Sequence, residues 1–324
     1  MSNNIISAGI QRSGGKFFLA KKLLRYTRYH KVFLSLFCGA CWFELRKKKA
    51  EIFEWWNDID QDLMNYLEII SEVPDLFDEI KEGFFGIVND KTLKRMLMLL
   101  EEPFEITDKE TYPISIRIKR AYAFYYVSKL MISKSMSKIG TPELNRPITN
   151  QDRGILTPLN LKAIKRLQYI HTTSMDFAEC YDKFRKHYQS NSYGIKPKEV
   201  LIYADKPYIN SDIYHFPEEK HFELAELLNN TEFSFMLSCR EDEYNRDMFK
   251  EDRFYFVPLK TRYPINVHSE SNKGVTELLI LNYNPEELGK TIPQMPFEDK
   301  LKKTKGKKIV SPKWNITKWI GDKK

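Results

Sequence analysis

The chain has 324 residues, 42% of them hydrophobic and 14% aromatic, which excludes a disordered protein and allows a sizeable core. This length suits one large α/β domain with an insertion, or two domains. A net charge of +8 favours a polyanionic partner such as nucleic acid or an anionic membrane. No run approaches the ~18 apolar residues of a membrane span, and the N-terminus lacks a signal-peptide pattern. We therefore expect a cytoplasmic protein with reduced cysteines and no membrane contact.

The first 70 residues alternate between helix and strand patterns. Residues 17–29 have helical apolar spacing, 31–37 and 51–57 read as strands, and 61–70 return to a helix. From about 71 to 155 the period stays helical and strand-like alternation is largely missing. We interpret this segment as an inserted, mostly helical subdomain.

An α/β pattern resumes after the insertion. The expected elements are a helix at 159–167, a short strand within 168–177, strands at 199–205 and 233–239, a helix at 218–230, and a closing antiparallel pair at 253–260 and 276–283. Strands separated by helices predict a mostly parallel sheet with helices on both faces. Ligands of such sheets bind outside the carboxyl ends of the strands. The lysine-rich stretch 300–308 that follows is either a solvated extension or a polyanion contact.

Two glycine-bearing turns are candidates for ligand binding. In "RSGGKFF", Gly14, Gly15 and Lys16 precede a predicted helix, whose N-terminus favours an anion; a plain loop is the alternative. In "LFCGACWF", Gly39 follows the first strand and can let a cofactor lie against the backbone. Both turns fall near the edge of the sheet where a ligand is expected.

The second turn also contains a C-x-x-C pair, Cys38 and Cys41. Such a pair is half of a zinc site or a redox pair, but a structural zinc site needs two more ligands, usually in a second close pair. Because Cys180 and Cys239 are isolated from each other, we interpret the pair as small apolar turn residues and expect no metal.

Acidic residues follow two further strands. Asp58 comes about 20 residues after the glycine turn, where a carboxylate can accept from ribose hydroxyls. Its alternative role is a helix N-cap, for which Asp60 is better suited. Asp176 and Phe177 form an acid–aromatic pair that can accept from an adenine amine and cover its ring.

The stretch "LIYADKPYIN" reads as a buried strand that ends abruptly in Asp205, Lys206, Pro207 and Tyr208. An aromatic ring beside a carboxylate at a strand end is a base-binding arrangement, in which the ring stacks and the carboxylate accepts from an exocyclic amine. An ordinary strand-ending turn is the alternative.

The order of these motifs resembles the Dam-like, D12-class DNA adenine-N6 methyltransferases. "GGKFFLAKKLL" is similar to the opening motif of that family, "FCGA" to its S-adenosylmethionine turn and "NDIDQDLMNYL" to its ribose-binding acidic segment. "MDF" is similar to its acid–aromatic pair, and "ADKPY" stands where the catalytic D-P-P-Y belongs. The likeness covers roughly residues 10–70 and 160–285.

The resemblance implies a Rossmann-like, S-adenosylmethionine-dependent methyltransferase of phage or restriction–modification type. Its catalytic domain would span 1–70 and 156–290, with a DNA-recognition insertion at 71–155 and a basic tail at 291–324. The partner would be double-stranded DNA, and the protein a monomer or a transient dimer. The residues implied to bind the cofactor are Phe37, Gly39, Asp58, Asp176 and Phe177, with Lys16 near the methionine end.

The implied catalysis is direct methyl transfer to the N6 amine of an adenine that has left the duplex. Tyr208 would stack on the base, while the Asp205 carboxylate and the Lys206 main-chain carbonyl would accept from the amine, with Pro207 completing the turn. Positioning and electrostatics would supply most of the rate. No covalent enzyme intermediate is needed.

The chain departs from the family pattern at four positions. Lys206 replaces the first proline of the catalytic motif, and Cys41 replaces a glycine of the cofactor turn, where a positive φ would be costly. Leu36 and Ser35 replace a proline and an acidic residue before that turn. The alternatives are a catalytically silent DNA-binding homologue or partner subunit, and an enzyme that methylates RNA.

Overall fold

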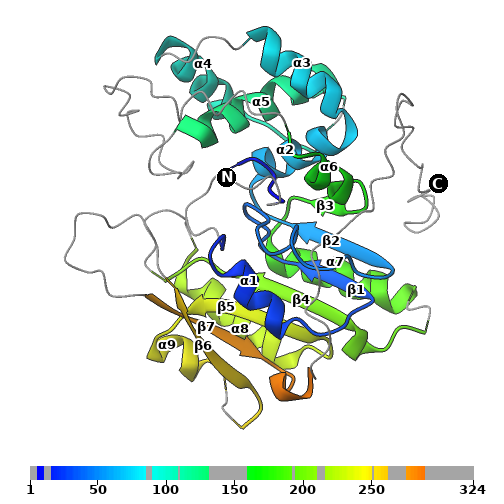
Figure 1. Cartoon of the computed structure of the whole chain (residues 1–324), viewed down its shortest axis with the longest axis vertical. Coiled ribbons are helices and arrows are strands. Elements are labelled where there is room, and N and C mark those ends of the chain that lie inside the picture. The colour runs from blue at the N-terminus through cyan, green and yellow to red at the C-terminus, as the bar shows by residue number, and fades with distance from the viewer. Residues whose placement is uncertain are drawn as a thin grey trace.

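The structure, a computed structural model, describes residues 6–10, 16–84, 90–108, 110–130, 159–191, 194–209, 216–249, 252–261 and 275–288. A seven-stranded sheet in the order β3-β2-β1-β4-β5-β7-β6 forms its centre (Figure 1). The strands are β1 (Val32–Ser35), β2 (Phe53–Asn57), β3 (His171–Thr173), β4 (Val200–Asp205), β5 (Ser234–Arg240), β6 (Tyr255–Thr261) and β7 (Val275–Leu281).

The first five strands of the sheet order, from β3 to β5, run parallel to one another, whereas β7 is antiparallel to both β5 and β6. The predicted mixed α/β fold with a closing antiparallel pair is therefore confirmed. Because the five parallel strands share one direction, their carboxyl ends lie along one edge of the sheet. The segments after these strands are consequently neighbours in space.

The helices are α1 (Ala20–Leu23), α2 (Gln61–Glu72), α3 (Pro74–Phe84), α4 (Asp90–Glu101), α5 (Ile114–Leu130), α6 (Leu161–Leu167), α7 (Phe177–Ser190), α8 (Glu218–Asn230) and α9 (Glu243–Asp247). Single 3-10 turns lie at Leu24–Tyr26, Pro197–Glu199 and Pro285–Leu288. Asp60 caps α2, as predicted, because its carboxylate accepts from the Leu63 amide at 3.0 Å.

Alternate residues of the central strands enter two separate cores. In β4, Leu201 and Tyr203 pack into the core that contains residues of α1, α2 and α5, whereas Val200, Ile202 and Ala204 pack into the core that contains residues of α7 and α8. This burial on both faces explains why the strand reads as a continuous apolar run. The same alternation sets the faces of the sheet toward which the Asp205 and Lys206 side chains point.

Two helix predictions need correction. The helix expected at 17–29 is only α1 with one 3-10 turn, because the chain becomes extended at Thr27 and the Thr27 hydroxyl donates to the Leu23 carbonyl at 3.0 Å. Helix α7 was not predicted, although it buries Phe177, Cys180 and Phe184 at helical spacing.

Helices α3, α4 and α5 occupy the described part of the predicted insertion, and no strand occurs among the residues described between 74 and 130. Helix α5 packs along α2, and buried arginines fix the two helices together: Arg117 pairs with Glu68 at 2.6 Å and Arg120 pairs with Asp62. Residues 131–158 and the predicted basic tail lie outside the described residues. No helix in the described ranges has the length and apolar character needed to cross a bilayer.

Candidate active site

The candidate residues gather at the carboxyl edge of the parallel strands. Phe37 and Gly39 follow β1, Asp58 follows β2, Asp176 follows β3, and Asp205 ends β4. The expectation that these stretches meet at one edge of the sheet agrees with the strand order. Gly14 and Gly15 lie outside the described residues.

A buried polar network surrounds the end of β4. The Lys16 ammonium lies 2.9 Å from the Asp205 carboxylate and 3.6 Å from that of Glu277, and it donates to the Tyr208 hydroxyl at 3.3 Å. The Tyr208 hydroxyl in turn donates to Glu277. Lys16 and Glu277 are almost completely buried, whereas the Asp205 side chain is 20% exposed. One cation thus links two carboxylates and the tyrosine of the turn.

The environment of Asp205 sets its protonation. Burial raises the pKa of this carboxyl to about 6, and the nearby Lys16 cation limits the rise. Glu277 acts in the opposite direction, since a second negative charge favours protonation of Asp205. At neutral pH Asp205 is therefore ionised and able to accept hydrogen bonds.

Two carboxyl groups of this site were missed by sequence reasoning. Glu277 lies within the predicted strand at 276–283, and a carboxylate among apolar strand residues was a signal that could have been used. Glu44 lies outside regular helices and strands, so its sequence gave no comparable signal. Its buried carboxyl accepts from the Ser35 hydroxyl at 2.8 Å, and burial raises its pKa to about 8.

The Lys206 side chain turns away from this network. Asp205 and Lys206 are consecutive at the end of a strand, so their side chains leave on opposite faces of the sheet. The Lys206 ammonium is buried and lies 3.0 Å from His221 Nδ1 of α8, and 5.9 Å from the centre of the Tyr244 ring of α9. This lysine therefore does not bring its charge to the Asp205 face, nor does it reach solvent.

The turn after β1 has an unusual backbone. Gly39 has φ +47°, and a Cβ placed on it would meet no heavy atom of the described structure within 4 Å. Cys41 has φ +55°, a left-handed conformation that favours glycine. Its thiol is buried and donates to the Gly39 carbonyl at 3.4 Å. Cysteine thus occupies a position whose backbone conformation favours glycine.

Asp58 ties this turn to the next strand. One carboxylate oxygen accepts from the Gly39 amide at 2.8 Å, and the other accepts from the Asp60 amide at 3.1 Å. Asp58 is only half-buried, and a carboxylate can accept more than two hydrogen bonds. The contact supports the loop and leaves acceptor capacity for a ligand.

The acid–aromatic pair has structural contacts of its own. Asp176 caps α7 by accepting from the Ala178 amide at 2.9 Å, and its second oxygen lies 3.1 Å from the Lys220 ammonium. The Phe177 ring is buried and packs 5.4 Å from the half-buried Phe37 ring, measured between centroids. Both rings also contact Phe216, which precedes α8.

The four cysteines are buried and free. Cys38 contacts the Met64 sulfur at 3.6 Å, as expected for a small apolar turn residue. Within the part of the chain that the structure describes, no cluster of three or more His, Cys, Asp or Glu side chains could hold a metal ion.

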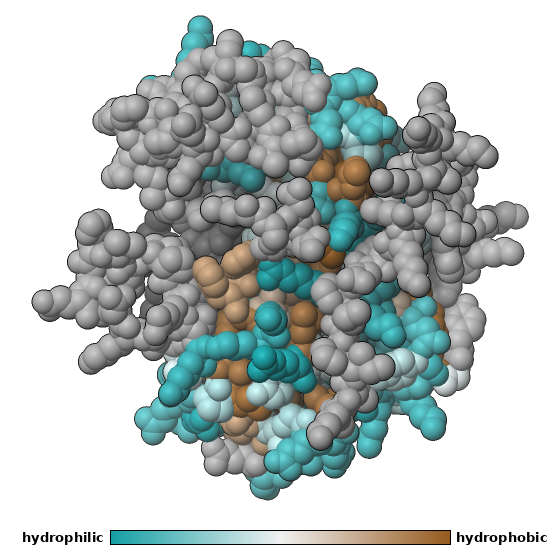
Figure 2. All heavy atoms as spheres, viewed as in Figure 1, coloured by the Kyte–Doolittle hydropathy of each residue, from teal (hydrophilic) through white to brown (hydrophobic). Residues whose placement is uncertain are grey.

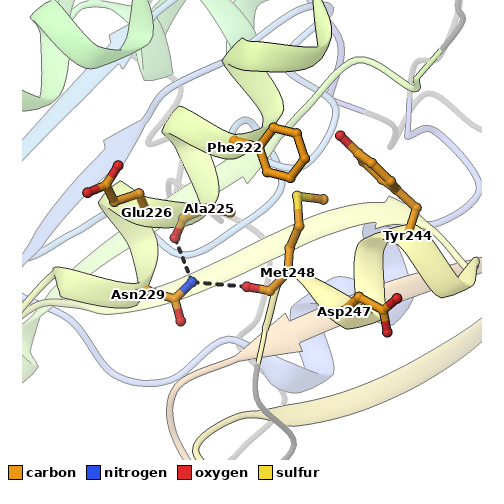
Figure 3. A pocket seen from close by; sticks show the side chains of 7 residues that line it. All are labelled: Phe222, Ala225, Glu226, Asn229, Tyr244, Asp247 and Met248. Carbon is orange, nitrogen blue, oxygen red and sulfur yellow. Dashed lines mark hydrogen bonds between the residues drawn. The ribbon is translucent and has the colours of Figure 1, made fainter.

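An open groove of about 500 Å³ lies between α8 and α9 and is lined by Tyr244, whose ring centre is 5.9 Å from the Lys206 ammonium. Figure 3 shows Phe222 and Tyr244 facing one another across it, above Met248, while Asn229 bonds to the carbonyls of Ala225 and Met248. None of the predicted site residues lines this groove. In the space-filling view of Figure 2, apolar residues are visible at the surface near the centre of the molecule, between hydrophilic ones.

A comparison with protein-family models matches residues 13–265 to the D12 class N6 adenine-specific DNA methyltransferase family. The chain belongs to this family. The match covers well over half of the chain, and it includes both glycine-bearing turns, both acidic segments and the turn after β4. A search of curated proteins found no match.

Family membership confirms the resemblance stated from the motifs and the methyltransferase fold. The family acts on adenine in DNA, and methyltransferases of this kind use S-adenosylmethionine in general. Glu277 lies beyond the matched range, so its place beside Tyr208 comes from the structure alone.

Proposed function

We propose that the protein transfers a methyl group from S-adenosylmethionine to N6 of an adenine flipped out of double-stranded DNA. The observation that carries this proposal is the Asp205 carboxylate, held by Lys16 beside Tyr208 at the sheet edge where ligands of such folds bind. A family specific for DNA adenine and a net charge of +8 support the choice of substrate.

The residues after β1, β2 and β3 suit the cofactor. Open space in front of Gly39 lets a ligand lie against the backbone, and Asp58 beside it retains acceptor capacity for ribose hydroxyls. Phe37 and Phe177 offer apolar ring surface, with the Asp176 carboxylate at the start of α7. When bound, S-adenosylmethionine supplies a methyl group on a positively charged sulfur. Lys16 is engaged with Asp205, so its contribution to the methionine end would be indirect.

The catalytic turn would hold the target base. Tyr208 would stack on the adenine, and the Asp205 carboxylate and the Lys206 main-chain carbonyl would accept hydrogen bonds from the N6 amine. These bonds orient the nitrogen lone pair toward the methyl group, and Pro207 restricts the backbone between the Lys206 carbonyl and Tyr208. Lys16 keeps Asp205 ionised, and Glu277 holds the Tyr208 hydroxyl.

Two findings weigh against a catalytically silent homologue. The Cys41 side chain is buried while the space in front of Gly39 is open, and the Lys206 charge lies on the opposite side of the strand from Asp205. Neither departure from the family pattern therefore removes a group on which the chemistry depends. We further propose that the segment 71–155 contacts the DNA target.

Incubation of the purified protein with tritiated S-adenosylmethionine and unmethylated genomic DNA tests the proposal. We expect label in N6-methyladenine, and none with Asp205→Ala. A parallel reaction with RNA distinguishes the two nucleic acids. Lack of label in both the DNA and the RNA reaction, with an active family member as positive control, would defeat the proposal. Calorimetry with S-adenosylmethionine would then show whether a catalytically silent homologue still binds the cofactor.

A further inference from the structure

The Lys206 side chain is buried behind the catalytic turn, with only 4% of it exposed. Burying a lysine is costly unless its protons find acceptors. Its ammonium lies 3.0 Å from Nδ1 of His221, a residue of α8 that is itself 1% exposed. The methyl-transfer chemistry makes no use of this side chain, so its burial requires another explanation.

The polarity of this contact follows from the two groups. A protonated lysine has three donors and no acceptor, so in this contact Lys206 donates and His221 Nδ1 accepts. Burial and the neighbouring Lys206 lower the pKa of His221 to about 4, so the ring is neutral at physiological pH. The hydrogen bond is therefore charge-assisted and directional.

Aromatic side chains hold His221 in place. Its ring meets the Phe216 ring edge to face at 4.7 Å and lies 6.2 Å from Tyr244, which also forms a wall of the groove in Figure 3. Phe216 packs against Phe37 and Phe177, the two rings proposed to meet the cofactor. His221 is thus a fixed acceptor.

The turn after β4 is consequently held on both faces of the sheet. Asp205 pairs with Lys16 on one face, and Lys206 bonds to His221 on the other. We infer that Lys206 is a positioning residue, whose bond to His221 fixes the catalytic turn against α8 so that Asp205 and Tyr208 stay aligned with the target base. This inference rests on the proposed function.

Lys206→Met tests the inference because it keeps the apolar stem and removes the donors. We expect kcat to fall about tenfold or more, since small displacements of reacting groups are costly, while the KM for S-adenosylmethionine changes less than about threefold. Lys183→Met is the matched control, because this lysine of α7 is 53% exposed and far less constrained. Its kcat should equal that of the wild type.

Changes at the acceptor supply a rescue test. His221→Asn can place an oxygen near the position of Nδ1, whereas His221→Leu has no acceptor. The asparagine variant should retain more of the wild-type kcat than the leucine variant, even if both lose some thermal stability. Equal kcat values in these two variants, or a wild-type kcat in Lys206→Met, would overturn the inference.

Hydrogen exchange of the full chain gives a readout that is independent of activity. Amides in peptides covering 200–209 should exchange faster in Lys206→Met and His221→Leu than in the wild type. In Lys183→Met their exchange rates should equal those of the wild type. Unchanged exchange in the first two variants would overturn the inference whether or not the wild type methylates DNA. If exchange is faster in these two variants but the wild-type protein does not methylate DNA, the positioning role of Lys206 is supported and the proposed function is defeated.

Discussion

Replacement of Lys16 by methionine should move the pH dependence of methyl transfer. In the proposed mechanism Asp205 must be ionised to accept from the target amine, and its pKa is about 6 while Lys16 lies 2.9 Å away. An adjacent opposite charge lowers a carboxyl pKa by about one to three pH units, equivalent to about 1.4 to 4 kcal/mol. Without the cation, Asp205 and Glu277 also remain as two neighbouring carboxyl groups, which favours a proton on one of them.

The direction of this pH shift follows from the protonation state of Asp205 in the active enzyme. Because the active form is the deprotonated one, activity is present above the pKa of Asp205 and is lost as pH falls through it. In the wild type we expect the acidic limb of kcat/KM near pH 6, and in Lys16→Met we expect it about one to three pH units higher.

Initial rates with tritiated S-adenosylmethionine between pH 5 and 9 measure this limb. Lys16→Arg is the control, since it retains a positive charge and should keep the limb near its wild-type position. A lower rate in Lys16→Met with an unmoved limb would refute the reasoning, because Lys16 would then affect binding or folding without setting the protonation of Asp205.

Substitutions at three further positions have expected outcomes. Glu277→Gln should lower kcat about tenfold by weakening the hold on the Tyr208 hydroxyl, measured as single-turnover methylation, with a wild-type rate contradicting that role. Cys41→Gly should change the free energy of unfolding, measured with urea, by less than about 1 kcal/mol, because relief of left-handed backbone strain opposes the loss of a buried thiol. Cys41→Val places a β-branched side chain at φ +55° and should lower the free energy of unfolding by more than Cys41→Gly does. Glu54→Gln should destabilise the fold by about 3–5 kcal/mol in the same assay, since two fully buried cations pair with this carboxylate, and a loss below about 1 kcal/mol would contradict this.

The sheet was largely predictable because its strands are buried on both faces. Continuous apolar runs such as Val200–Ala204 are typical of strands buried on both faces, and polar residues end them at the edge where ligands of such sheets generally bind. The helix at 218–230 was also predicted to the residue from its amphipathic spacing. Helix α7 was not predicted because Asp176 and Phe177 were interpreted only as ligand contacts. In the structure the aspartate caps the helix, and the phenylalanine is the first of its buried residues.

The partners within the site were less predictable, because they depend on contacts between distant segments. Lys16 and Glu277 are separated by most of the chain, and only the packing of the N-terminal segment over β4 and β7 brings them together. The direction of Lys206 follows from strand alternation, but its partner could not be known before α8 was placed. Similarly, the sequence leaves the sign of φ at Cys41 open, whereas the structure gives +55°.

Because the Asp205 and Lys206 side chains point in opposite directions, the Lys206 cation does not approach Lys16 or the proposed cofactor site. A cation on the Asp205 face would compete with Lys16 and lie close to a positively charged cofactor, which would weaken binding of both cofactor and base. On the other face, the same cation lies 3.0 Å from the His221 imidazole. Moving the cation two residues back on that same face, away from His221, should therefore be harmful. Ala204→Lys combined with Lys206→Ala would bury an ammonium in the apolar core of α7 and α8 without the His221 acceptor. Loss of fold or activity in that variant, compared with Lys206→Ala alone, measures the value of the present arrangement.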